Sequence, residues 1–455
     1  MDPTTTSQVA QWSIGNLVAG SQTAPIQNLS TDTRSLQPGD LFIAIRGQNF
    51  DGHRLVHQAA QRGAIGAIVE EIPPNLPADF AIILVSNTIE ALQSLATHYR
   101  QTLPLRALAV TGSSGKTTAK DLTLSVLREA FQVTGTTGNL NNHLGVPLSL
   151  LQAQSSDQFG VFEIGMNHPG ETAPLAKIVA PEIAIITNIG TAHLEFLHTR
   201  DAIAHEKGYL AEALPSTGTL ILNAHDDYTP TLTNRTRASV VLAGIDLGEV
   251  YASNLTPHFA GTTFLLHAHG QVAEANLPVP GRHMVLNAVL ATAAGIAAGL
   301  SLAACANGLA KLRLTPGRLQ QKIIRGLHLL DDTYNANPES VVAALQTLAT
   351  LPSKGQRIAV LGRMGELGDQ AEASHRLIGQ TVAQLPIDRL ITVGQDARWI
   401  ADAAEAAGLQ QVLRLESTAE ATQALLKFTQ PEDLVLIKGS RSATMELILN
   451  GLAAQ

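Results

Sequence analysis

Cysteine and aromatic residues are scarce in this sequence of 455 residues. The single cysteine, Cys305, excludes an internal disulfide framework and a zinc site built on cysteines. Aromatic residues make up 4% of the chain and charged residues 15%, against 45% hydrophobic residues. This balance is unlike that of a disordered chain or a coiled coil. We therefore expect globular domains, and the length suggests two to four of them.

An excess of basic residues is also missing. Lysine and arginine total 30 and aspartate and glutamate total 38, which gives a formal net charge of −8. A protein that coats nucleic acid needs many cationic contacts to phosphates. The charge therefore argues against a nucleic-acid partner.

One long segment lacks charge altogether. Residues 284–310 contain no Asp, Glu, Lys or Arg, and Gly295 and Gly299 form a GxxxG pattern that is found in membrane helices. The segment consists mostly of Ala and Gly, which partition weakly into lipid, and Gly299-Leu300-Ser301 is typical of a helix end followed by an N-cap. We predict two short buried helices and no stable membrane insertion. The first residues show no basic region followed by an apolar stretch, so we expect a cytoplasmic protein.

Apolar runs alternate with helix-like segments along most of the chain, which predicts α/β domains with largely parallel sheets. Boundaries are expected near residues 102–104 and 314–318, giving domains at 1–104, 105–315 and 316–455. The first is a smaller α/β domain, and the third resembles an open Rossmann-like sheet. Strands are expected at 40–45, 63–69, 81–85, 105–110, 160–165, 183–189, 327–331, 357–361, 389–393, 411–415 and 433–437. An amphipathic helix is expected at 418–428, and another that follows the strand at 105–110 is expected to end near residue 131.

A glycine-rich turn follows the strand expected at 105–110. It reads Thr111-Gly112-Ser113-Ser114-Gly115-Lys116-Thr117-Thr118 and leads into a helix. Small residues let backbone N–H groups converge on phosphate oxygens at a helix N-terminus, while a lysine neutralises the β- and γ-phosphates and a hydroxyl ligates Mg²⁺. The position that usually carries the first glycine of this motif is Val110. The alternative is an ordinary strand-to-helix turn with an exposed lysine.

The loop alone does not distinguish a motor, a switch, a kinase and a ligase. A guanine-reading NKxD motif is absent from the sequence, which argues against a GTPase. A small-molecule kinase and a non-catalytic nucleotide-binding module stay open at this point.

The variant of the loop resembles that of the Mur ligases, the ATP-dependent amide-bond ligases of peptidoglycan synthesis. The resemblance covers nearly the whole chain. It is carried also by Thr31-Asp32-Thr33-Arg34, Gly39-Asp40-Leu41-Phe42, Asp51-Gly52-His53, Gly138-Asn139-Leu140-Asn141-Asn142-His143, Phe162-Glu163-Ile164-Gly165, Asn188-Ile189-Gly190-Thr191-Ala192-His193 and Lys438-Gly439-Ser440-Arg441. It implies a UDP-substrate-binding first domain, a P-loop ATPase-like central domain and an amino-acid- or dipeptide-binding third domain.

Two stretches resemble one branch of that family. Asn139-Leu140-Asn141-Asn142 and Asp331-Asp332-Thr333-Tyr334-Asn335-Ala336-Asn337-Pro338-Glu339-Ser340 are similar to the members that add D-alanyl-D-alanine to UDP-N-acetylmuramoyl-tripeptide. The alternative within the family is a ligase that adds a diamino acid to UDP-N-acetylmuramoyl-dipeptide. The chain departs from the family at Arg363, where an acidic residue is common.

The resemblance implies that ATP converts a substrate carboxylate into an acyl phosphate, which an amine then attacks. Two Mg²⁺ ions would be held by Thr117, Glu163, His193 and Lys207, the last as a carbamate, and the catalytic residues would be Lys116, His193 and Lys207. From the residues themselves, Glu163 ends an apolar strand, where a carboxylate is costly without a cation. Without the resemblance, His193 is read as a capping or core histidine and Lys207 as a solvated lysine. The spacing of His193 and His198 is taken as a coincidence.

The resemblance also implies ligand contacts. The nucleotide would be bound by Gly112, Ser113, Ser114, Gly115, Lys116, Thr117, Thr118, Asn287, Arg318, Asp332 and Tyr334. The substrates would be bound by Thr33, Arg34, Asn139, Asn141, Asn142, Asn335, Asn337, Lys438, Ser440 and Arg441. Plain structural roles stay open for several of these: a core hydrogen bond for Asn287, a β-turn for Thr33 and Arg34, and a helix start at residues 335–338. We expect a monomer.

Overall fold

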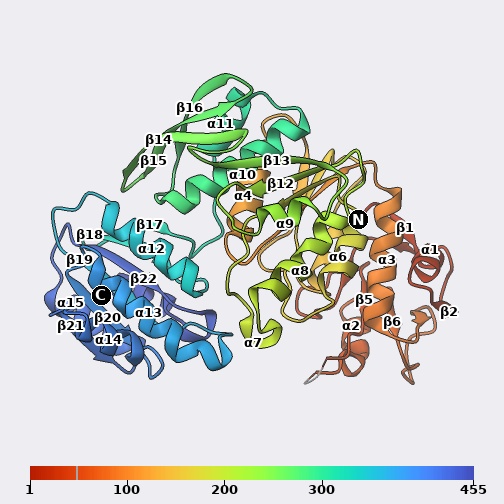
Figure 1. Cartoon of the computed structure of the whole chain (residues 1–455). Coiled ribbons are helices and arrows are strands. Elements are labelled where there is room, and N and C mark those ends of the chain that lie inside the picture. Colours follow the sequence, from red (N-terminus) through yellow and green to blue (C-terminus); the bar gives the residue numbers. More distant parts are fainter. Residues whose placement is uncertain (48–49, 455) are drawn as a thin grey trace. The chain divides into compact units, whose positions relative to one another are not determined.

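The computed structural model describes residues 1–47 and 50–454, which divide into two compact units (Figure 1). The first unit consists of Met1–Ala109, Phe131–Met166 and Gly170–Glu182. The second consists of Val110–Ala130, Asn167–Pro169 and Ile183–Gln455. The chain passes from one to the other within strand β8 (Arg106–Thr111).

The first unit begins with a five-stranded sheet in the order β2-β7-β6-β5-β4. Strands β4 to β7 are parallel and β2 is antiparallel to β7. One face of the sheet is closed by apolar side chains such as Phe42, Val56 and Val69. The elements of this part are β1 (Thr4–Thr5), α1 (Thr6–Trp12), β2 (Asn16–Ala19), β3 (Pro25–Ile26), β4 (Leu29–Ser30), β5 (Leu41–Ile43), η1 (Gly52–Leu55), α2 (Val56–Gln61), β6 (Gly66–Val69), β7 (Ala81–Leu84) and α3 (Thr88–Thr102).

The remainder of the first unit holds a parallel strand pair and two helices. Strand β10 (Phe159–Glu163) is buried along its whole length and pairs with β9 (Val133–Gly135). Helices α5 (Gly145–Leu150) and α6 (Thr172–Val179) complete this part. Glu163, the last residue of β10, therefore lies next to the loop that precedes α5 and accepts a hydrogen bond from Asn141 in that loop.

In the second unit, strands β11 to β16 form a continuous run of sheet. β11 to β14 pair in parallel, whereas β14, β15 and β16 form an antiparallel meander. The elements of this part are α4 (Lys116–Leu127), β11 (Ile183–Ile186), α7 (Leu194–Leu197), α8 (Arg200–Glu212), β12 (Thr219–Asn223), α9 (Thr229–Thr233), β13 (Ser239–Ile245), β14 (Val250–His258), β15 (Gly261–Ala268) and β16 (Gln271–Leu277).

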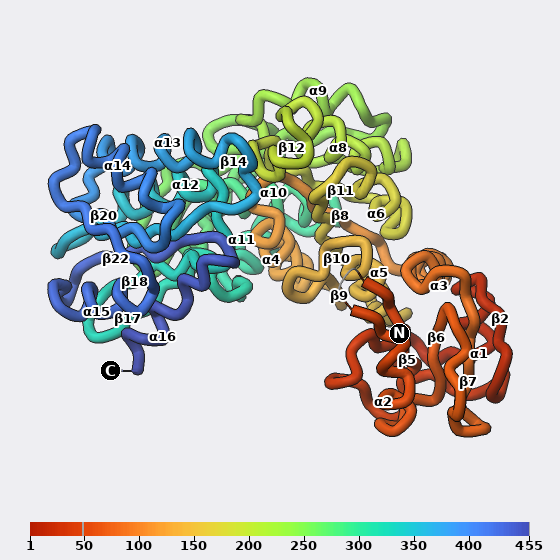
Figure 2. The backbone as a smooth tube through the Cα atoms, turned by 90° about the horizontal axis from the view of Figure 1, so that it is seen from below, coloured from red at the N-terminus to blue at the C-terminus, as the bar shows by residue number. Residues whose placement is uncertain are grey.

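The uncharged segment at 284–310 forms two helices, as predicted. Helix α10 (Arg282–Ala298) ends at Gly299, whose φ of 103° is left-handed, and α11 (Leu302–Ala310) begins after Ser301, whose side chain accepts from the N–H of Ala304. Helix α10 is buried almost all round because it packs against both α4 and α11 (Figure 2). Within the described residues, no helix has the length and apolarity needed to span a membrane.

The last part of the second unit is a six-stranded sheet in the order β17-β18-β22-β19-β20-β21. Every pair is parallel except β17 with β18. Residues of α15 and α16 pack on one face of this sheet. The elements are β17 (Gln320–Ile324), β18 (Leu327–Asp332), α12 (Pro338–Thr350), β19 (Arg357–Leu361), η2 (Gly368–Gln370), α13 (Ala371–Gln384), β20 (Arg389–Val393), α14 (Arg398–Ala406), β21 (Val412–Leu415), α15 (Thr418–Phe428), β22 (Leu434–Lys438), η3 (Arg441–Ala443) and α16 (Glu446–Ala454).

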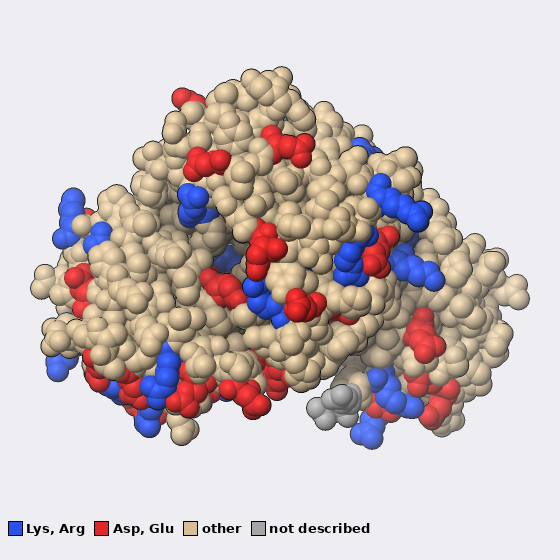
Figure 3. Space-filling view, in the orientation of Figure 1, with Lys and Arg blue, Asp and Glu red and all other residues tan. Residues whose placement is uncertain are grey.

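The surface carries both signs of charge. On the face shown in Figure 3, acidic and basic side chains are interspersed with large uncharged areas. Many of the charges are paired at short range, as in the contact of Arg414 with Asp402 and Glu405. Part of the charge is therefore compensated by neighbouring residues of opposite sign.

Candidate active site

At its two glycines, the turn between β8 and α4 has no room for a side chain. Gly112 has a φ of 148°, and a Cβ on it would lie 1.9 Å from Thr187 Oγ1. Gly115 has a φ of 81°, and a Cβ on it would lie 2.7 Å from Asn287 Oδ1. Both glycines are therefore required by conformation and by contact.

The turn is braced by the segment that follows β11. The Asn188 side chain accepts from the N–H of Ser114 at 2.8 Å, and its carbonyl accepts from the N–H of Ser113 at 3.0 Å. Thr187 Oγ1 donates to the carbonyl of Ser114 at 2.5 Å, and Ser113 Oγ accepts from the N–H of Gly190 at 2.8 Å. These contacts fix the backbone of the turn without any ligand.

The first residues of α4 meet an arginine from the start of the C-terminal part. Lys116 Nζ donates to the carbonyl of Gly112 at 2.7 Å. Arg318 Nη2 donates to Thr117 Oγ1 at 3.0 Å, and its guanidinium lies 4.2 Å from the ring centroid of Tyr334. Thr118 is buried in the first turn of the helix. The structure thus brings Asn287 and Arg318 to the glycine-rich turn, with Tyr334 against the Arg318 guanidinium.

Basic side chains lie beside this turn. Lys207 on α8 is fully buried, and within the described residues its Nζ has no hydrogen-bond partner. Burial, followed by the charge of Lys116, holds the pKa of Lys207 well below its ordinary value. Burial also lowers the pKa of His193, and the charges of Lys116 and Lys207 add to that effect. A buried amine without a hydrogen-bond partner, as at Lys207, is costly unless a ligand engages it.

Glu163 lies in the first unit, where it contacts a residue of the asparagine-rich loop. Its Oε1 accepts from Asn141 Nδ2 at 2.7 Å, whereas its Oε2 is buried and has no hydrogen-bond partner among the described residues. Asn142 Oδ1 accepts from the N–H of Gly145, the first residue of α5, at 2.8 Å. The side chain of Asn139 is exposed.

Thr33 and Arg34 lie in a turn of the first unit. Thr33 is buried, and its Oγ1 donates to Gln58 Oε1 at 3.1 Å. Arg34 is exposed and forms an ion pair with Asp32, in which Nη2 and Oδ2 are 2.7 Å apart. The hydrogen bonds from Arg34 lower the pKa of Asp32 to about 2.

The predicted residues around β18 form a compact group. Lys438 and Asp332 are both buried and pair at 2.6 Å, and Lys438 also donates to the carbonyl of Asn335 at 2.8 Å. Burial lowers the pKa of Lys438, while Asp332 opposes that shift. Asn337 caps α12 with a reciprocal capping box to Ser340. The helix-start alternative is therefore correct for Asn337.

Ser440 and Arg441 follow β22 and contact the loop after β19. The N–H of Ser440 donates to the carbonyl of Arg363 at 2.9 Å. Arg441 is exposed and pairs with Glu446 at 3.2 Å, and Arg363 pairs with Asp396 at 3.4 Å. These loops lie at the carboxyl edge of a parallel sheet, where ligands commonly bind.

Two acidic residues near the site were not predicted from the sequence. Glu339 accepts from Thr191, and Glu366 lies 2.8 Å from His193. Glu339 lies in the stretch 331–340 that resembles the family, but that stretch predicts no contact with Thr191, and Glu366 lies in none of the motifs. Both lie far along the chain from the loop that they reach, so only the folded structure could reveal them.

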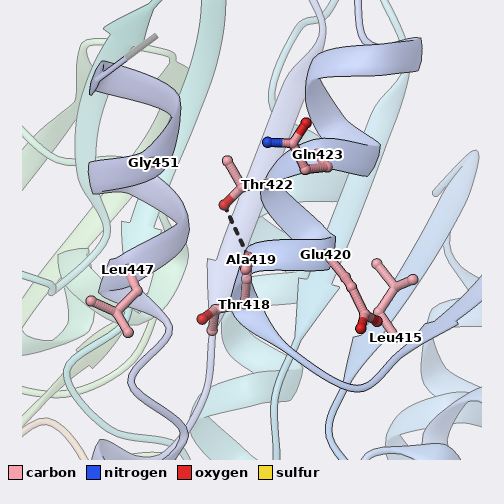
Figure 4. Close-up of a pocket in the computed structure, with 8 residues that line it drawn as sticks. All are labelled: Leu415, Thr418, Ala419, Glu420, Thr422, Gln423, Leu447 and Gly451. Atoms are coloured by element: carbon pink, nitrogen blue, oxygen red, sulfur yellow. Dashed lines mark hydrogen bonds between the residues drawn. The ribbon is translucent and has the colours of Figure 1, made fainter.

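A separate hollow lies between α15 and α16 and has a volume of about 680 Å³ (Figure 4). None of the predicted site residues lines it. The residues that line it are Leu415, Thr418, Ala419, Glu420, Thr422, Gln423, Leu447 and Gly451.

Three family descriptions match the chain. Residues 110–295 match the Mur ligase middle domain, residues 317–441 match "Mur ligase, glutamate ligase domain", and residues 25–100 match "Mur ligase family, catalytic domain". Two relatives are named UDP-N-acetylmuramoyl-tripeptide–D-alanyl-D-alanine ligase. The Escherichia coli protein is 37% identical, covering 93% of each chain, and the Bacillus subtilis protein is 36% identical, covering 94% of this chain and 93% of the relative.

Solved structures match as well. A crystal structure of MurF from Acinetobacter baumannii covers 100% of both chains with a TM-score of 0.92 and 35% identity. The MurF ligase from Thermotoga maritima in complex with ADP covers 94% of this chain and 97% of that one, with a TM-score of 0.83 and 26% identity. The predicted fold class, α/β with mostly parallel sheets in several domains, is thereby confirmed.

Proposed function

The chain belongs to the Mur ligase family, and from that premise we propose that it adds D-alanyl-D-alanine to UDP-N-acetylmuramoyl-tripeptide in peptidoglycan precursor synthesis. The reaction is an ATP-dependent ligation that forms a C–N bond. Relatives of that name extend over nearly the whole chain. The glycine-rich turn, His193, Lys207 and Arg318 all belong to the second unit.

The chemistry proceeds by activation of a carboxylate. A carboxylate oxygen of the tripeptide attacks the γ-phosphorus of ATP, and ADP leaves. The free amine of D-Ala-D-Ala then attacks the carbonyl carbon of the acyl phosphate. The C–O bond to phosphate breaks, inorganic phosphate leaves with one former carboxylate oxygen, and the amine loses a proton. The first step brings two anions together and the second expels anionic phosphate, so cationic side chains near the phosphates lower both barriers.

The glycine-rich turn is our proposed phosphate site. Its backbone is held by Thr187 and Asn188 before any ligand binds, which is the preorganisation that electrostatic stabilisation requires. Lys116 and Arg318 would neutralise the phosphates, with Gly112, Ser113, Ser114, Gly115, Thr117 and Thr118 around them. We assign Asn287 and Tyr334 to the base side of the nucleotide and Asp332 to the ribose.

Magnesium fits two features of the described residues. The buried Oε2 of Glu163 and the buried Nζ of Lys207 have no hydrogen-bond partner there. We propose Thr117, Glu163, His193 and Lys207 as ligands, and bound Mg²⁺ would screen the charge on the phosphates.

The unpartnered, buried amine of Lys207 is the observation that carries this part of the proposal most strongly. An amine must be unprotonated to react with CO₂, and burial lowers the pKa of Lys207. The carbamate that forms would supply the oxygen ligands that Mg²⁺ prefers.

The substrates need further contacts. We propose Thr33, Arg34, Asn139, Asn141 and Asn142 for the UDP-linked substrate. For the dipeptide side we propose Asn335, Asn337, Lys438, Ser440 and Arg441. The corresponding domains are residues 1–104 for the UDP substrate, 105–315 for ATP and 316–455 for the dipeptide. We place the reaction in the cytoplasm, where ATP is supplied, and propose that a single chain suffices.

A panel of acceptors tests the proposal. The purified protein is given ATP, Mg²⁺ and UDP-N-acetylmuramoyl-tripeptide with D-Ala-D-Ala, and in parallel UDP-N-acetylmuramoyl-dipeptide with a diamino acid. We expect equal amounts of ADP, phosphate and peptide product with D-Ala-D-Ala only. Product with the diamino acid only would identify the other branch of the family. Phosphate retained on the product would identify a kinase. The Lys116→Ala variant should form no product.

A further inference from the structure

Two charged side chains hold the backbone of Ile189, in the loop that follows β11. Asp226 Oδ2, from the loop after β12, accepts from the N–H of Ile189 at 2.8 Å. Arg200, the first residue of α8, donates from Nη2 to the carbonyl of Ile189 at 2.7 Å. Ile189 is buried, so both of its backbone groups need partners within the protein. Hydrogen bonds to ionised groups are roughly twice as strong as those between neutral groups.

The two peptide groups that flank Ile189 also reach the glycine-rich turn. The group between Asn188 and Ile189 donates to the carboxylate, and its carbonyl accepts from the N–H of Ser113 at 3.0 Å. The group between Ile189 and Gly190 accepts from the guanidinium, and its N–H donates to Ser113 Oγ at 2.8 Å. The carbonyl and the N–H of a trans peptide group point in opposite directions. Each peptide group therefore connects one charged side chain to Ser113.

Residues 226–228 support both charged side chains. Asp227 forms an ion pair with Arg200, in which Oδ1 and Nη2 are 2.5 Å apart. The Arg200 guanidinium also lies 4.7 Å from the ring centroid of Tyr228. Asp226 Oδ1 accepts from the N–H of Tyr228 at 2.9 Å. Three consecutive residues thus fix the carboxylate and the guanidinium relative to each other.

The two charges also strengthen the hydrogen bonds on the far side of the peptide groups. A carboxylate bound to the N–H makes the carbonyl of the same peptide group a better acceptor, and a guanidinium on the carbonyl makes the N–H a better donor. Both effects act on Ser113. Its neighbour Ser114 donates to the side chain of Asn188 at 2.8 Å. The first N–H groups of a helix have no partner within it, so those of α4 suit a phosphate once the turn is held.

We propose that Asp226 and Arg200 are positioning residues of the phosphate site. They act on Ser113 through the peptide groups beside Ile189 and so keep the glycine-rich turn in the conformation that receives the nucleotide. That the turn binds phosphate rests on the proposed function, whereas the hydrogen bonds themselves do not.

Amide hydrogen exchange in the full-length protein without nucleotide tests Asp226. We expect the Ser113 N–H to exchange roughly ten times faster in Asp226→Ala than in the wild type, because the charge on its partner peptide group is lost. Asp226→Asn has one acceptor oxygen for two N–H groups, so its rate should lie between these two, and it carries the test if Asp226→Ala does not fold. An unchanged Ser113 rate in the variants would overturn the proposal for Asp226.

Asp201→Ala is the matched control. Asp201 belongs to the same group of side chains, where it accepts from Tyr228 Oη at 2.7 Å. Its removal deletes a nearby carboxylate and leaves the contacts of Asp226 and Arg200 with Ile189 in place. We expect wild-type exchange at Ser113, and a rate as fast as in Asp226→Ala would contradict a specific role for Asp226.

The same experiment on Arg200→Ala tests the other side chain. The Gly190 N–H should exchange roughly ten times faster than in the wild type, because the guanidinium no longer holds the carbonyl of the same peptide group. Equal exchange of Gly190 in the two proteins would remove Arg200 from the proposal.

Nucleotide binding gives the functional test. Calorimetric titration should show a Kd for ADP about tenfold higher in Asp226→Ala and unchanged in Asp201→Ala, because a turn that is no longer preorganised must be ordered by the ligand. The KM for ATP should rise similarly, with an unchanged KM for D-Ala-D-Ala at saturating ATP. A role in overall stability alone would reduce the active fraction, and hence kcat, at constant KM for both substrates. That result would contradict the proposal.

These measurements separate the positioning role from the proposed function. If the wild type forms no peptide while the exchange rates and the ADP affinity respond as expected, the proposed ligation fails and the positioning role stands. If peptide forms while neither the exchange rates nor the ADP affinity change in the variants, the ligation stands and the positioning role is overturned.

Discussion

At the scale of single residues, the turn before α4 requires glycine at two positions, and each glycine packs against a different neighbour. Gly112 faces Thr187 and Gly115 faces Asn287, so each is packed against a side chain that also belongs to the site. The general phosphate-loop pattern expects a glycine at the position of Val110, but Val110 is fully buried. The conformational requirement therefore lies at Gly112 and Gly115.

We predict that Gly115→Ala weakens nucleotide binding at least about tenfold. The new methyl group would be 2.7 Å from Asn287 Oδ1, so the turn or α10 must shift. Gly270→Ala is the matched control, since Gly270 has a similar φ of 74° and no atom within 4 Å of an added Cβ. Calorimetric titration with ADP measures both variants, and equal affinities would contradict the requirement for glycine at position 115.

Residue-level roles were only partly predictable from the sequence. The resemblance directed attention to Asn287, Arg318 and Tyr334, and the structure brings Asn287 and Arg318 to the turn, with Tyr334 against the Arg318 guanidinium. The braces Thr187 and Asn188 and the carboxylates Glu339 and Glu366 were not predicted as contacts. Hydrogen bonds across more than 70 residues of sequence depend on the fold, and no local pattern encodes them.

At the scale of helices and strands, the sequence was most informative where apolar runs were bounded by turn residues. The strands at 357–361 and 389–393 and the helix at 418–428 were predicted with the bounds that the structure has. The helix after the turn ends at Leu127, about four residues before the predicted end near residue 131. The meander β14 to β16 was missed, because β16 is largely exposed and β14 contains Pro257, which weakens the strand pattern.

Helices α10 and α11 show how two glycines of one GxxxG pattern can serve different purposes. Gly295 lets α10 approach its neighbours, since a Cβ there would be 2.6 Å from Val126 Cγ1 and 2.7 Å from Cys305 Sγ. Gly299 ends the helix in a left-handed conformation. The pattern therefore reflects packing in a protein core, with Cys305 fully buried at the contact.

This packing predicts an alkaline loss of stability that depends on Cys305. Burial raises the pKa of its thiol from 9.0 to about 12. Between those values the unfolded thiol has lost a proton that the native state retains, so stability is present in full below pH 9 and falls above it, by up to about 1.4 kcal/mol per pH unit. Urea unfolding from pH 8 to 10.5 should show a steeper decline for the wild type than for Cys305→Ala.

The single thiol also permits a direct check on that packing. The native protein should react with a thiol reagent far more slowly than the denatured protein at pH 8.5. Parallel slopes in the two unfolding series, together with rapid labelling of the native protein, would contradict the assignment of Cys305 to the core.

At the scale of the whole molecule, the fold class and the reaction class were predictable because the motifs run through almost the entire sequence. Matches at 25–100, 110–295 and 317–441 span the three stretches in which those motifs occur. What local patterns do not give is how residues from different stretches meet. The contacts of Arg318 with Thr117, Glu339 with Thr191 and Glu366 with His193 all join the C-terminal part to the nucleotide-binding part.

The central claim is that a carboxylate becomes electrophilic by accepting the γ-phosphoryl group of ATP. The most direct test uses UDP-N-acetylmuramoyl-tripeptide labelled with ¹⁸O in the reacting carboxylate, with ATP, Mg²⁺ and D-Ala-D-Ala, and mass spectrometry of the phosphate released. The account predicts one ¹⁸O atom in each phosphate and one in the new amide. Phosphate without label, formed alongside the peptide product, would contradict it.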